Sequence, residues 1–163
     1  MIDIRSTSFL KCSKSEIPKL IKEHGSVGVI GHGFVGKAVS EFFKDYCSVL
    51  VYDKAGSANT LRQIIEKCEV MFLCLPTPMR EDGKCHTEIV ESVLTEVKTL
   101  AIAIGRPLDS FVVVIKSTVP PGFTEEMQLQ HLPMRIVFSP EFLTEKNAIE
   151  DFKNCNRIIV ARR

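Results

Sequence analysis

The stretch Ser-Val-Gly-Val-Ile-Gly-His-Gly-Phe-Val-Gly, residues 26–36, decides how the rest of this chain can be arranged. A short apolar run comes first, three glycines follow, and an apolar pattern with helical spacing begins at once. This order predicts a strand, a tight turn and a helix. Gly31 would allow the sharp turn, Gly33 would let a ligand approach the backbone, and Gly36 would let the helix pack closely on the strand.

Glycines at this spacing, between a strand and a helix, are the fingerprint of dinucleotide-binding units. The ligand's phosphates would lie on the free N–H groups at the helix N-terminus, where Phe34 and Val35 begin the helix. The next apolar run, 49–52, ends at Asp53, whose carboxylate would accept hydrogen bonds from a ribose diol. A carboxylate repels a 2′-phosphate, so Asp53 favours NAD over NADP, although Lys54 weakens that preference. The alternative is a glycine turn followed by a surface aspartate.

The composition is that of a single domain with a substantial core: 163 residues, 45% of them hydrophobic and 25% charged. The formal net charge of +1 gives no broad basic field, so nucleic acid is not an expected partner. The sequence has no apolar run of about 18 residues and no signal-peptide pattern at its start, so we expect no membrane contact. Six scattered cysteines without C-x-x-C pairs indicate free thiols in a cytoplasmic protein, with neither disulfides nor a metal site.

Residues 1–25 are expected to form an N-terminal extension to a domain over 26–163. Within the extension, Ser-Lys-Ser-Glu at 13–16 has the form of a capping box, and apolar residues then recur at helical spacing until Gly25. We predict a short amphipathic helix that covers the sheet or its edge. The alternative is a docking element for a partner or a second subunit, which leaves an oligomer possible.

Beyond the glycine turn, helical and apolar segments alternate along the chain. The run 70–75 is apolar throughout, which is typical of a strand buried on both faces of a parallel sheet. The pattern therefore predicts an α/β fold with a doubly wound, mainly parallel sheet. Strands are expected at 26–30, 48–52, 70–75, 111–115, 135–138 and 157–160, and helices at 34–45, 61–68 (Leu61, Ile64, Ile65 and Cys68 on one face), 89–101 and 125–130.

Ligands of such sheets bind outside the carboxyl ends of the strands, so the loops there carry most of the information about function. They are Pro-Thr-Pro at 76–78, Lys-Ser-Thr-Val-Pro-Pro-Gly at 116–122 and Ser-Pro-Glu-Phe-Leu-Thr-Glu at 139–145. We expect all three to face one cleft. Each loop alone is also ordinary turn chemistry, and Glu141 and Glu145 could be an exposed helical pair.

Taken together, the glycine motif, Asp53 and these loops resemble the UDP-glucose and GDP-mannose dehydrogenase family. Leu73-Cys74-Leu75, Asp151 and Arg157-Ile158-Ile159-Val160 also match, so the resemblance covers about residues 26 to 160. It implies a Rossmann fold that binds NAD. In that family the enzyme oxidises the C6 alcohol of a nucleotide sugar to a carboxylate in two hydride transfers.

The resemblance also implies roles for individual residues. Thr118 looks like the family threonine that helps place a catalytic water, and Glu141 resembles the general acid/base candidate. Glu145 would be a second carboxylate near the nicotinamide or the sugar. The residues expected to bind the cofactor are Gly31, Gly33, Phe34, Val35, Gly36, Asp53, Lys54, Pro76, Thr77, Ser117 and Thr118.

The sequence departs from the family pattern as well. Family members continue into a second domain that supplies most sugar-binding residues and a catalytic cysteine in a Gly-Gly-x-Cys-x-Pro-Lys-Asp setting. None of the six cysteines here has that setting, the sequence ends at Arg163, and no lysine can be matched to the family's active-site lysine. Lys146 stands where the family usually has glycine, and Asn154-Cys155-Asn156 replaces the usual Pro-Asp.

We therefore expect an NAD-binding domain that is inactive or incomplete as this chain alone. A second chain or domain would then supply the sites for UDP-glucose or GDP-mannose. One alternative is a non-catalytic module that binds NAD or a nucleotide and acts as a regulatory or assembly protein. Another is a different small Rossmann oxidoreductase with Glu141 as its base.

Overall fold

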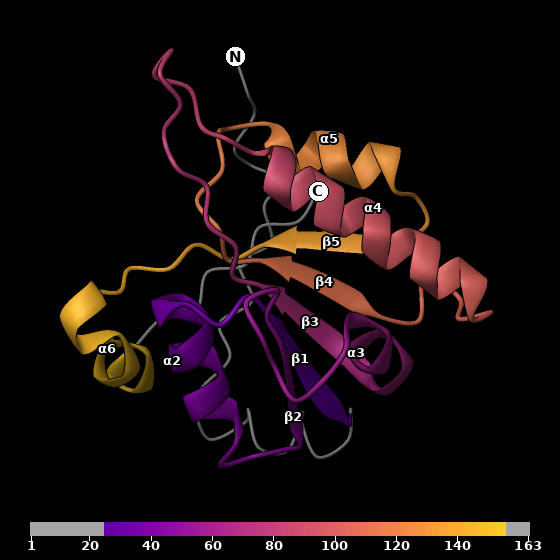
Figure 1. Cartoon of the computed structure of the whole chain (residues 1–163), viewed down its shortest axis with the longest axis horizontal. Helices are drawn as coiled ribbons and strands as arrows, with labels where there is room; N and C mark the ends of the chain where they lie inside the picture. The colour runs from indigo at the N-terminus through magenta and orange to yellow at the C-terminus, as the bar shows by residue number, and fades with distance from the viewer. Residues whose placement is uncertain (1–24, 156–163) are drawn as a thin grey trace, which may run out of the picture.

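Apolar runs of the sequence form a five-stranded parallel β-sheet in the computed structural model, which describes residues 25–155 (Figure 1). The strand order is β2-β1-β3-β4-β5, and every neighbouring pair is parallel. The chain starts in the middle, moves out to β2, and returns past β1 to β3, which creates a topological switch point between β1 and β3. The strands are β1 (Ser26–Ile30), β2 (Val49–Tyr52), β3 (Cys68–Leu73), β4 (Val112–Ile115) and β5 (Arg135–Phe138).

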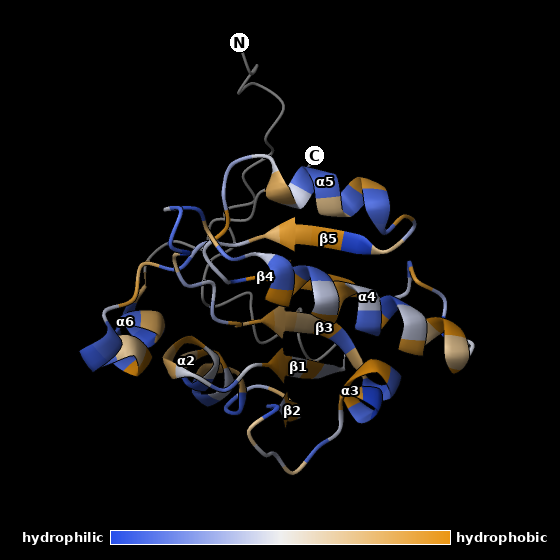
Figure 2. Ribbon diagram, turned by 45° about the horizontal axis from the view of Figure 1, so that its top comes forward, coloured by the Kyte–Doolittle hydropathy of each residue, from blue (hydrophilic) through white to orange (hydrophobic). Residues whose placement is uncertain are grey.

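Helices cover both faces of this sheet. The larger core lies on the face that carries α3, α4 and α5, and α2 packs with α6 on the other face. Figure 2 shows the strands mostly in the colour of hydrophobic residues, while α4 alternates between hydrophobic and hydrophilic. The helices are α2 (Phe34–Phe43), α3 (Leu61–Lys67), α4 (Glu88–Ala103), α5 (Phe123–Gln130) and α6 (Ala148–Asn154), with a 3-10 turn, η2 (Glu145–Asn147), before α6.

Both faces of β3 are covered, as its continuous apolar run predicts. Met71 and Leu73 are fully buried in the larger core, whereas Phe72 packs against Phe43 of α2, with ring centroids 5.2 Å apart. Phe42 in turn contacts Phe152 of α6 at 5.3 Å. The prediction of a doubly wound α/β sheet is confirmed.

The ends of several elements differ from the sequence prediction by one or two residues, and α6 was not predicted. The boundary between α3 and β3 is the most informative, because the prediction placed Cys68 on the apolar face of the third helix. The helix ends at Lys67, and Cys68 is the first residue of β3, two positions earlier than the predicted strand. The Cys68 N–H still donates to the Ile64 carbonyl and so closes the last helical turn. Cys68 also pairs with Ser26 of β1 as the first residue of the strand. Helix and strand therefore follow each other without a loop, which the apolar pattern could not reveal because Cys68 is buried in either assignment.

Two sequence predictions lie outside the described residues: the amphipathic helix that follows residue 13 and the strand over 157–160. The division into an extension, 1–25, and a domain, 26–163, therefore stays a prediction.

Candidate dinucleotide-binding site

The glycine turn after β1 needs two of its three glycines for its own packing. Gly31 has φ +92°, in the left-handed region, and a Cβ there would lie 2.5 Å from the Cys74 carbonyl oxygen. A Cβ on Gly36 would lie 2.0 Å from the Gly31 carbonyl oxygen, because α2 packs directly against the turn. These contacts confirm the sharp turn and the close helix packing that the spacing predicts.

Gly33 is different, because a Cβ at this position would meet no atom within 4 Å. It is the N-cap of α2, it provides no side-chain cap, and the first turn of the helix has no acidic residue. The helix N-terminus therefore presents N–H groups and the positive end of its dipole to open space, which suits a phosphate. The protein itself gives no packing reason for glycine at this position.

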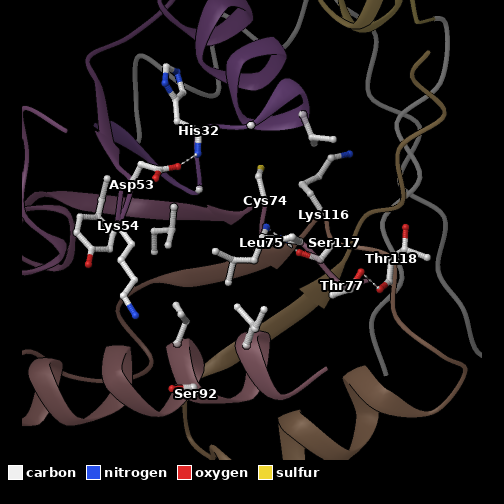
Figure 3. A pocket seen from close by; sticks show the side chains of 18 of the residues that line it. His32, Asp53, Lys54, Cys74, Leu75, Thr77, Ser92, Lys116, Ser117 and Thr118 are labelled. Carbon is white, nitrogen blue, oxygen red and sulfur yellow. Dashed lines mark hydrogen bonds between the residues drawn. The ribbon is translucent and has the colours of Figure 1, made fainter. Parts of the chain in front are cut away.

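Asp53 is held in place at the end of β2 by the backbone. One carboxylate oxygen accepts the His32 N–H at 2.6 Å (Figure 3), and the other accepts the Ala55 N–H at 2.8 Å. These two hydrogen bonds, that from His32 first, lower the pKa of the Asp53 carboxyl, so it is ionised at neutral pH. Each oxygen retains a lone pair that can accept a ribose hydroxyl.

A cleft of about 1250 Å³ runs along the carboxyl ends of the strands and brings the predicted residues together. Its lining comes from the glycine turn, the end of β2, the loops after β3 and β4 and one side of α4 (Figure 3), and from Glu141 in the segment after β5. The expectation that the three loops face one cleft is confirmed. The predicted residues in its lining are Gly31, Gly33, Phe34, Val35, Asp53, Lys54, Pro76, Thr77, Ser117, Thr118 and Glu141.

Two predicted residues lie outside this lining. Gly36 is buried behind the turn, where its role is to admit the helix. Glu145 is exposed in η2. The turn before η2 is held by Asp151, whose carboxylate accepts the Thr144 N–H at 2.8 Å and the Thr144 hydroxyl at 2.5 Å. Since residues 139–144 are not helical, Glu141 and Glu145 do not form the helical pair that the sequence left open.

The loops after β3 and β4 are joined by side chain to backbone hydrogen bonds. The Leu75 N–H donates to the Ser117 hydroxyl at 2.9 Å, and the Thr77 hydroxyl donates to the Thr118 carbonyl at 2.7 Å (Figure 3). Ser117 is buried and its hydroxyl already serves this contact, whereas Thr118 is exposed. Of the two candidate hydroxyls in this loop, Thr118 is therefore the one more accessible to a ligand.

The structure adds cleft residues that the sequence analysis did not select. Lys116 is 5% exposed and burial lowers the pKa of its ammonium group. Cys74 lies beside it, and burial raises the pKa of this thiol to about 12, so it is protonated and a poor nucleophile. A lysine directly after an apolar strand is a visible signal in the sequence, but its burial depends on segments far along the chain.

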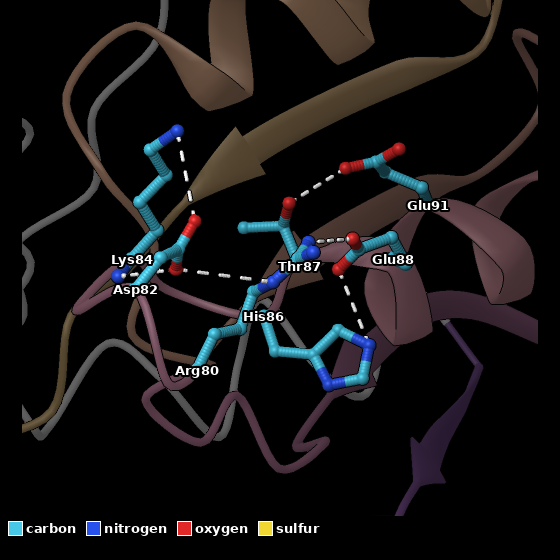
Figure 4. Close-up of polar contacts among 7 residues, drawn as sticks. All are labelled: Arg80, Asp82, Lys84, His86, Thr87, Glu88 and Glu91. Atoms are coloured by element: carbon cyan, nitrogen blue, oxygen red, sulfur yellow. Dashed lines mark hydrogen bonds and ion pairs between the residues drawn. The ribbon is translucent and has the colours of Figure 1, made fainter.

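The segment between β3 and α4 forms a small hairpin at the edge of the cleft, closed by a bridge between Met79 and Cys85. Glu88, at the start of α4, pairs with Arg80 and with the His86 ring, at 3.2 Å, and both His86 and Glu88 line the cleft (Figure 4). Exposed ion pairs of this kind contribute little stability. Their effect is to hold the hairpin against the helix.

Within residues 25–155, no group of three His, Cys, Asp or Glu side chains could hold a metal ion. The same part of the chain contains no helix that is both long and apolar enough to span a membrane. Cys47, Cys68, Cys74 and Cys85 are free thiols.

Comparison with known proteins adds an independent line of evidence. The family model of the UDP-glucose/GDP-mannose dehydrogenase family, NAD binding domain, matches residues 48–163. The glycine turn precedes that segment, so its geometry supports the assignment separately. UDP-glucose 6-dehydrogenase of Campylobacter jejuni is 36% identical over 125 residues, which cover 76% of this chain and 29% of that protein. The Streptococcus pneumoniae UDP-glucose 6-dehydrogenase is 27% identical, covering 82% and 40%.

Solved structures agree with this assignment. A UDP-glucose dehydrogenase from Pyrobaculum islandicum superposes with a TM-score of 0.71 at 26% identity, over 84% of this chain and 40% of that one. GDP-mannose dehydrogenase from Pseudomonas aeruginosa, at 18% identity and a TM-score of 0.63 over 77% and 38%, shares the fold. The chain thus spans less than half the length of these relatives. It belongs to the UDP-glucose/GDP-mannose dehydrogenase family, as the NAD-binding domain of that family.

Proposed function

We propose that the cleft holds NAD between two ends defined by different residues. The adenosine end consists of the glycine turn, 31–36, with Asp53 and Lys54. The nicotinamide end consists of residues 116–118 and Glu141. Asp53 would bind the adenosine ribose and the N-terminus of α2 the pyrophosphate, with Phe34 and Val35 in its first turn.

The observation that carries this proposal is the open space at Gly33. This space lies in the cleft at the N-terminus of α2. No protein atom lies close enough to a Cβ at position 33 to require glycine there. Asp53 stands on one side of it, so the second half of a dinucleotide has to extend over the ends of β3, β4 and β5. The loops that meet there, with Pro76, Thr77 and Thr118, are the ones that line the cleft.

The ionised Asp53 supports a preference for NAD over NADP. A 2′-phosphate would bring negative charge next to a carboxylate whose pKa is already lowered. Lys54 also lines this end and reduces the repulsion without removing the carboxylate.

We further propose that the chain is the cofactor-binding part of a nucleotide-sugar dehydrogenase. Bound NAD would accept hydride from the C6 alcohol of UDP-glucose or GDP-mannose. Glu141 is half-buried in the cleft wall and would take the alcohol proton, and Thr118 would hold a water nearby. Glu145 lies outside the cleft lining. It would act beside them only if binding of a second chain or domain brought the sugar next to η2.

A second candidate function is a non-catalytic NAD-binding module with a regulatory or assembly role. It is favoured by Cys74, the cysteine among the cleft-lining residues, because a buried thiol with a pKa of about 12 supplies no thiolate for a covalent step. The free thiols of the described residues also support a reducing, cytoplasmic location.

Titration calorimetry with the Gly33→Val variant tests the cleft assignment. The added side chain would occupy the space for the pyrophosphate, so NAD binding should fall below detection at millimolar ligand. The melting temperature should fall by only a few degrees, because a Cβ at this position meets no protein atom and the remaining cost is that valine is a poorer N-cap than glycine. Gly33→Ala should show an intermediate loss. Unchanged NAD affinity in Gly33→Val would contradict the assignment.

A further inference from the structure

Lys116 is a buried cation in the wall of the cleft. It follows β4 directly, its backbone N–H donates to the Leu73 carbonyl at 2.8 Å, and only 5% of its surface is exposed. It nevertheless lines the cleft, and Figure 3 shows its side chain next to Cys74. Lysine is among the residues that are least often buried without a partner, so its surroundings matter.

Three groups from later segments hold the ammonium in position. Its Nζ donates to the Pro140 carbonyl at 3.3 Å and to the Ser139 hydroxyl at 3.5 Å, and it lies 5.6 Å from the centre of the Phe152 ring. The end of β5 and helix α6 thus enclose it from two sides. These contacts keep the charge in the cleft wall and favour the protonated form.

The charge of Lys116 is not neutralised by a direct ion pair with any described carboxylate, all of which lie more than 4.0 Å from its Nζ. The titratable groups that face it are Cys74, Glu141 and Cys155, and their negative forms would oppose the lowering of its pKa by burial. Cys74 is protonated at neutral pH. Glu141 is the carboxylate among these groups, and it lies beyond ion-pair distance of the Lys116 Nζ.

We propose that Lys116 determines which oxidation state of the dinucleotide the cleft prefers, and that it favours NADH over NAD⁺. The inference rests on the proposed function, which puts the nicotinamide beside residues 116–118 and Glu141. The nicotinamide ring carries a positive charge only in the oxidised form, so a fixed buried cation repels the ring of NAD⁺ and does not repel the neutral ring of NADH. Repulsion between two like charges in a partly buried site corresponds to roughly a tenfold difference in affinity.

The experiment compares the dissociation constants of NAD⁺ and NADH at pH 7.5 by calorimetry. The wild-type chain should bind NADH about tenfold more tightly. Lys116→Met removes the charge with little change in side-chain volume, and it should bring the two constants close together, mainly by tightening NAD⁺. Lys98→Met is the matched control, because the Lys98 Nζ also donates to a backbone carbonyl, that of Gln130, away from the cleft.

Two further variants separate charge from structure. Lys116→Arg keeps the charge and should keep the NADH preference, whereas Glu141→Gln removes the compensating charge and should strengthen that preference. If Lys116 were merely structural, Lys116→Met would weaken the binding of NAD⁺ and NADH equally and leave the ratio of their dissociation constants unchanged. That result would overturn this inference and leave the proposed function standing. A wild-type ratio near one would also overturn it. Failure of the wild type to bind either form would overturn the proposed function as well.

Discussion

The adenosine end and the nicotinamide end of the cleft are held together in different ways. The adenosine end consists of a short turn whose glycines contact each other, with Asp53 fixed by the His32 and Ala55 N–H groups. The nicotinamide end is assembled from segments that follow β4 and β5, and the Thr77 hydroxyl ties the first of them to the loop after β3 by donating to the Thr118 carbonyl. We infer that this chain alone can bind a dinucleotide, and we expect that chemistry at the other end requires groups from a second chain or domain.

The largest expected effect is that this chain alone does not oxidise UDP-glucose. The purified chain of 163 residues should not convert UDP-glucose to UDP-glucuronate with excess NAD, because none of its cysteines has the family's catalytic setting and Cys74 is protonated in the cleft. Poor positioning of the substrate alone can cost roughly 7–11 kcal/mol of barrier reduction. NADH absorbance is measured with UDP-glucose and GDP-mannose, and an intact UDP-glucose 6-dehydrogenase serves as the positive control. Turnover with two NADH formed per sugar would show that both ends are complete.

A second prediction separates the glycine that packs from the glycine that faces the cleft. Gly36→Ala should lower the free energy of unfolding by about 3 kcal/mol, because its Cβ would overlap the Gly31 carbonyl oxygen and force α2 away from the turn. Denaturant unfolding measures this, with Gly33→Ala as the matched control that should change stability little. Equal losses in the two variants would mean that the turn does not distinguish packing from binding positions.

The third prediction tests the role of the carboxylate at the adenosine end. Asp53→Ala should weaken NAD binding by about 1–2 kcal/mol, which is the magnitude of a lost hydrogen bond to a charged group. NADP binding should weaken less or improve, since the repulsion of its 2′-phosphate is removed. Calorimetry with both cofactors gives the ratio of the two affinities. Asp151→Ala provides the comparison, because it removes a carboxylate of α6 that accepts the Thr144 N–H outside the cleft lining. A parallel loss for NAD and NADP would argue against the preference.

The smallest effect is a pH dependence of stability at the adenosine end. Because the folded-state pKa of Asp53 is lowered, its contribution to stability is present above its ordinary value of 3.8 and is lost as the pH falls through the folded value. The Asp53 side chain is partly exposed to solvent, which screens its interactions, so this contribution should stay below about 1 kcal/mol. Unfolding curves of Asp53→Asn and the wild type between pH 6 and pH 2 should therefore converge at low pH. A constant difference across this range would rule out the linkage.

The sequence predicted the adenosine end in more detail than the nicotinamide end. The contacts around Gly31 and Gly36 agree with their predicted roles, because a strand, a tight turn and a helix at that spacing permit few backbone paths. The convergence of the three loops was also predictable, since the carboxyl ends of parallel strands share one edge of the sheet. The sequence could not predict that Thr118 is exposed while Ser117 is buried. Beyond the end of a strand, the local turn decides which of two successive side chains is buried.

What the sequence by itself determined is the parallel doubly wound sheet, the glycine turn with Asp53 beside it, and the family to which the chain belongs. These features depend on residues close together in the chain or on the order of strands. Only the tertiary structure decided that Lys116 is a buried cation in the cleft wall and that Glu145 lies outside the cleft. The physical reason is that burial of Lys116 depends on the end of β5 and on α6, more than twenty residues away, and no local pattern encodes such contacts.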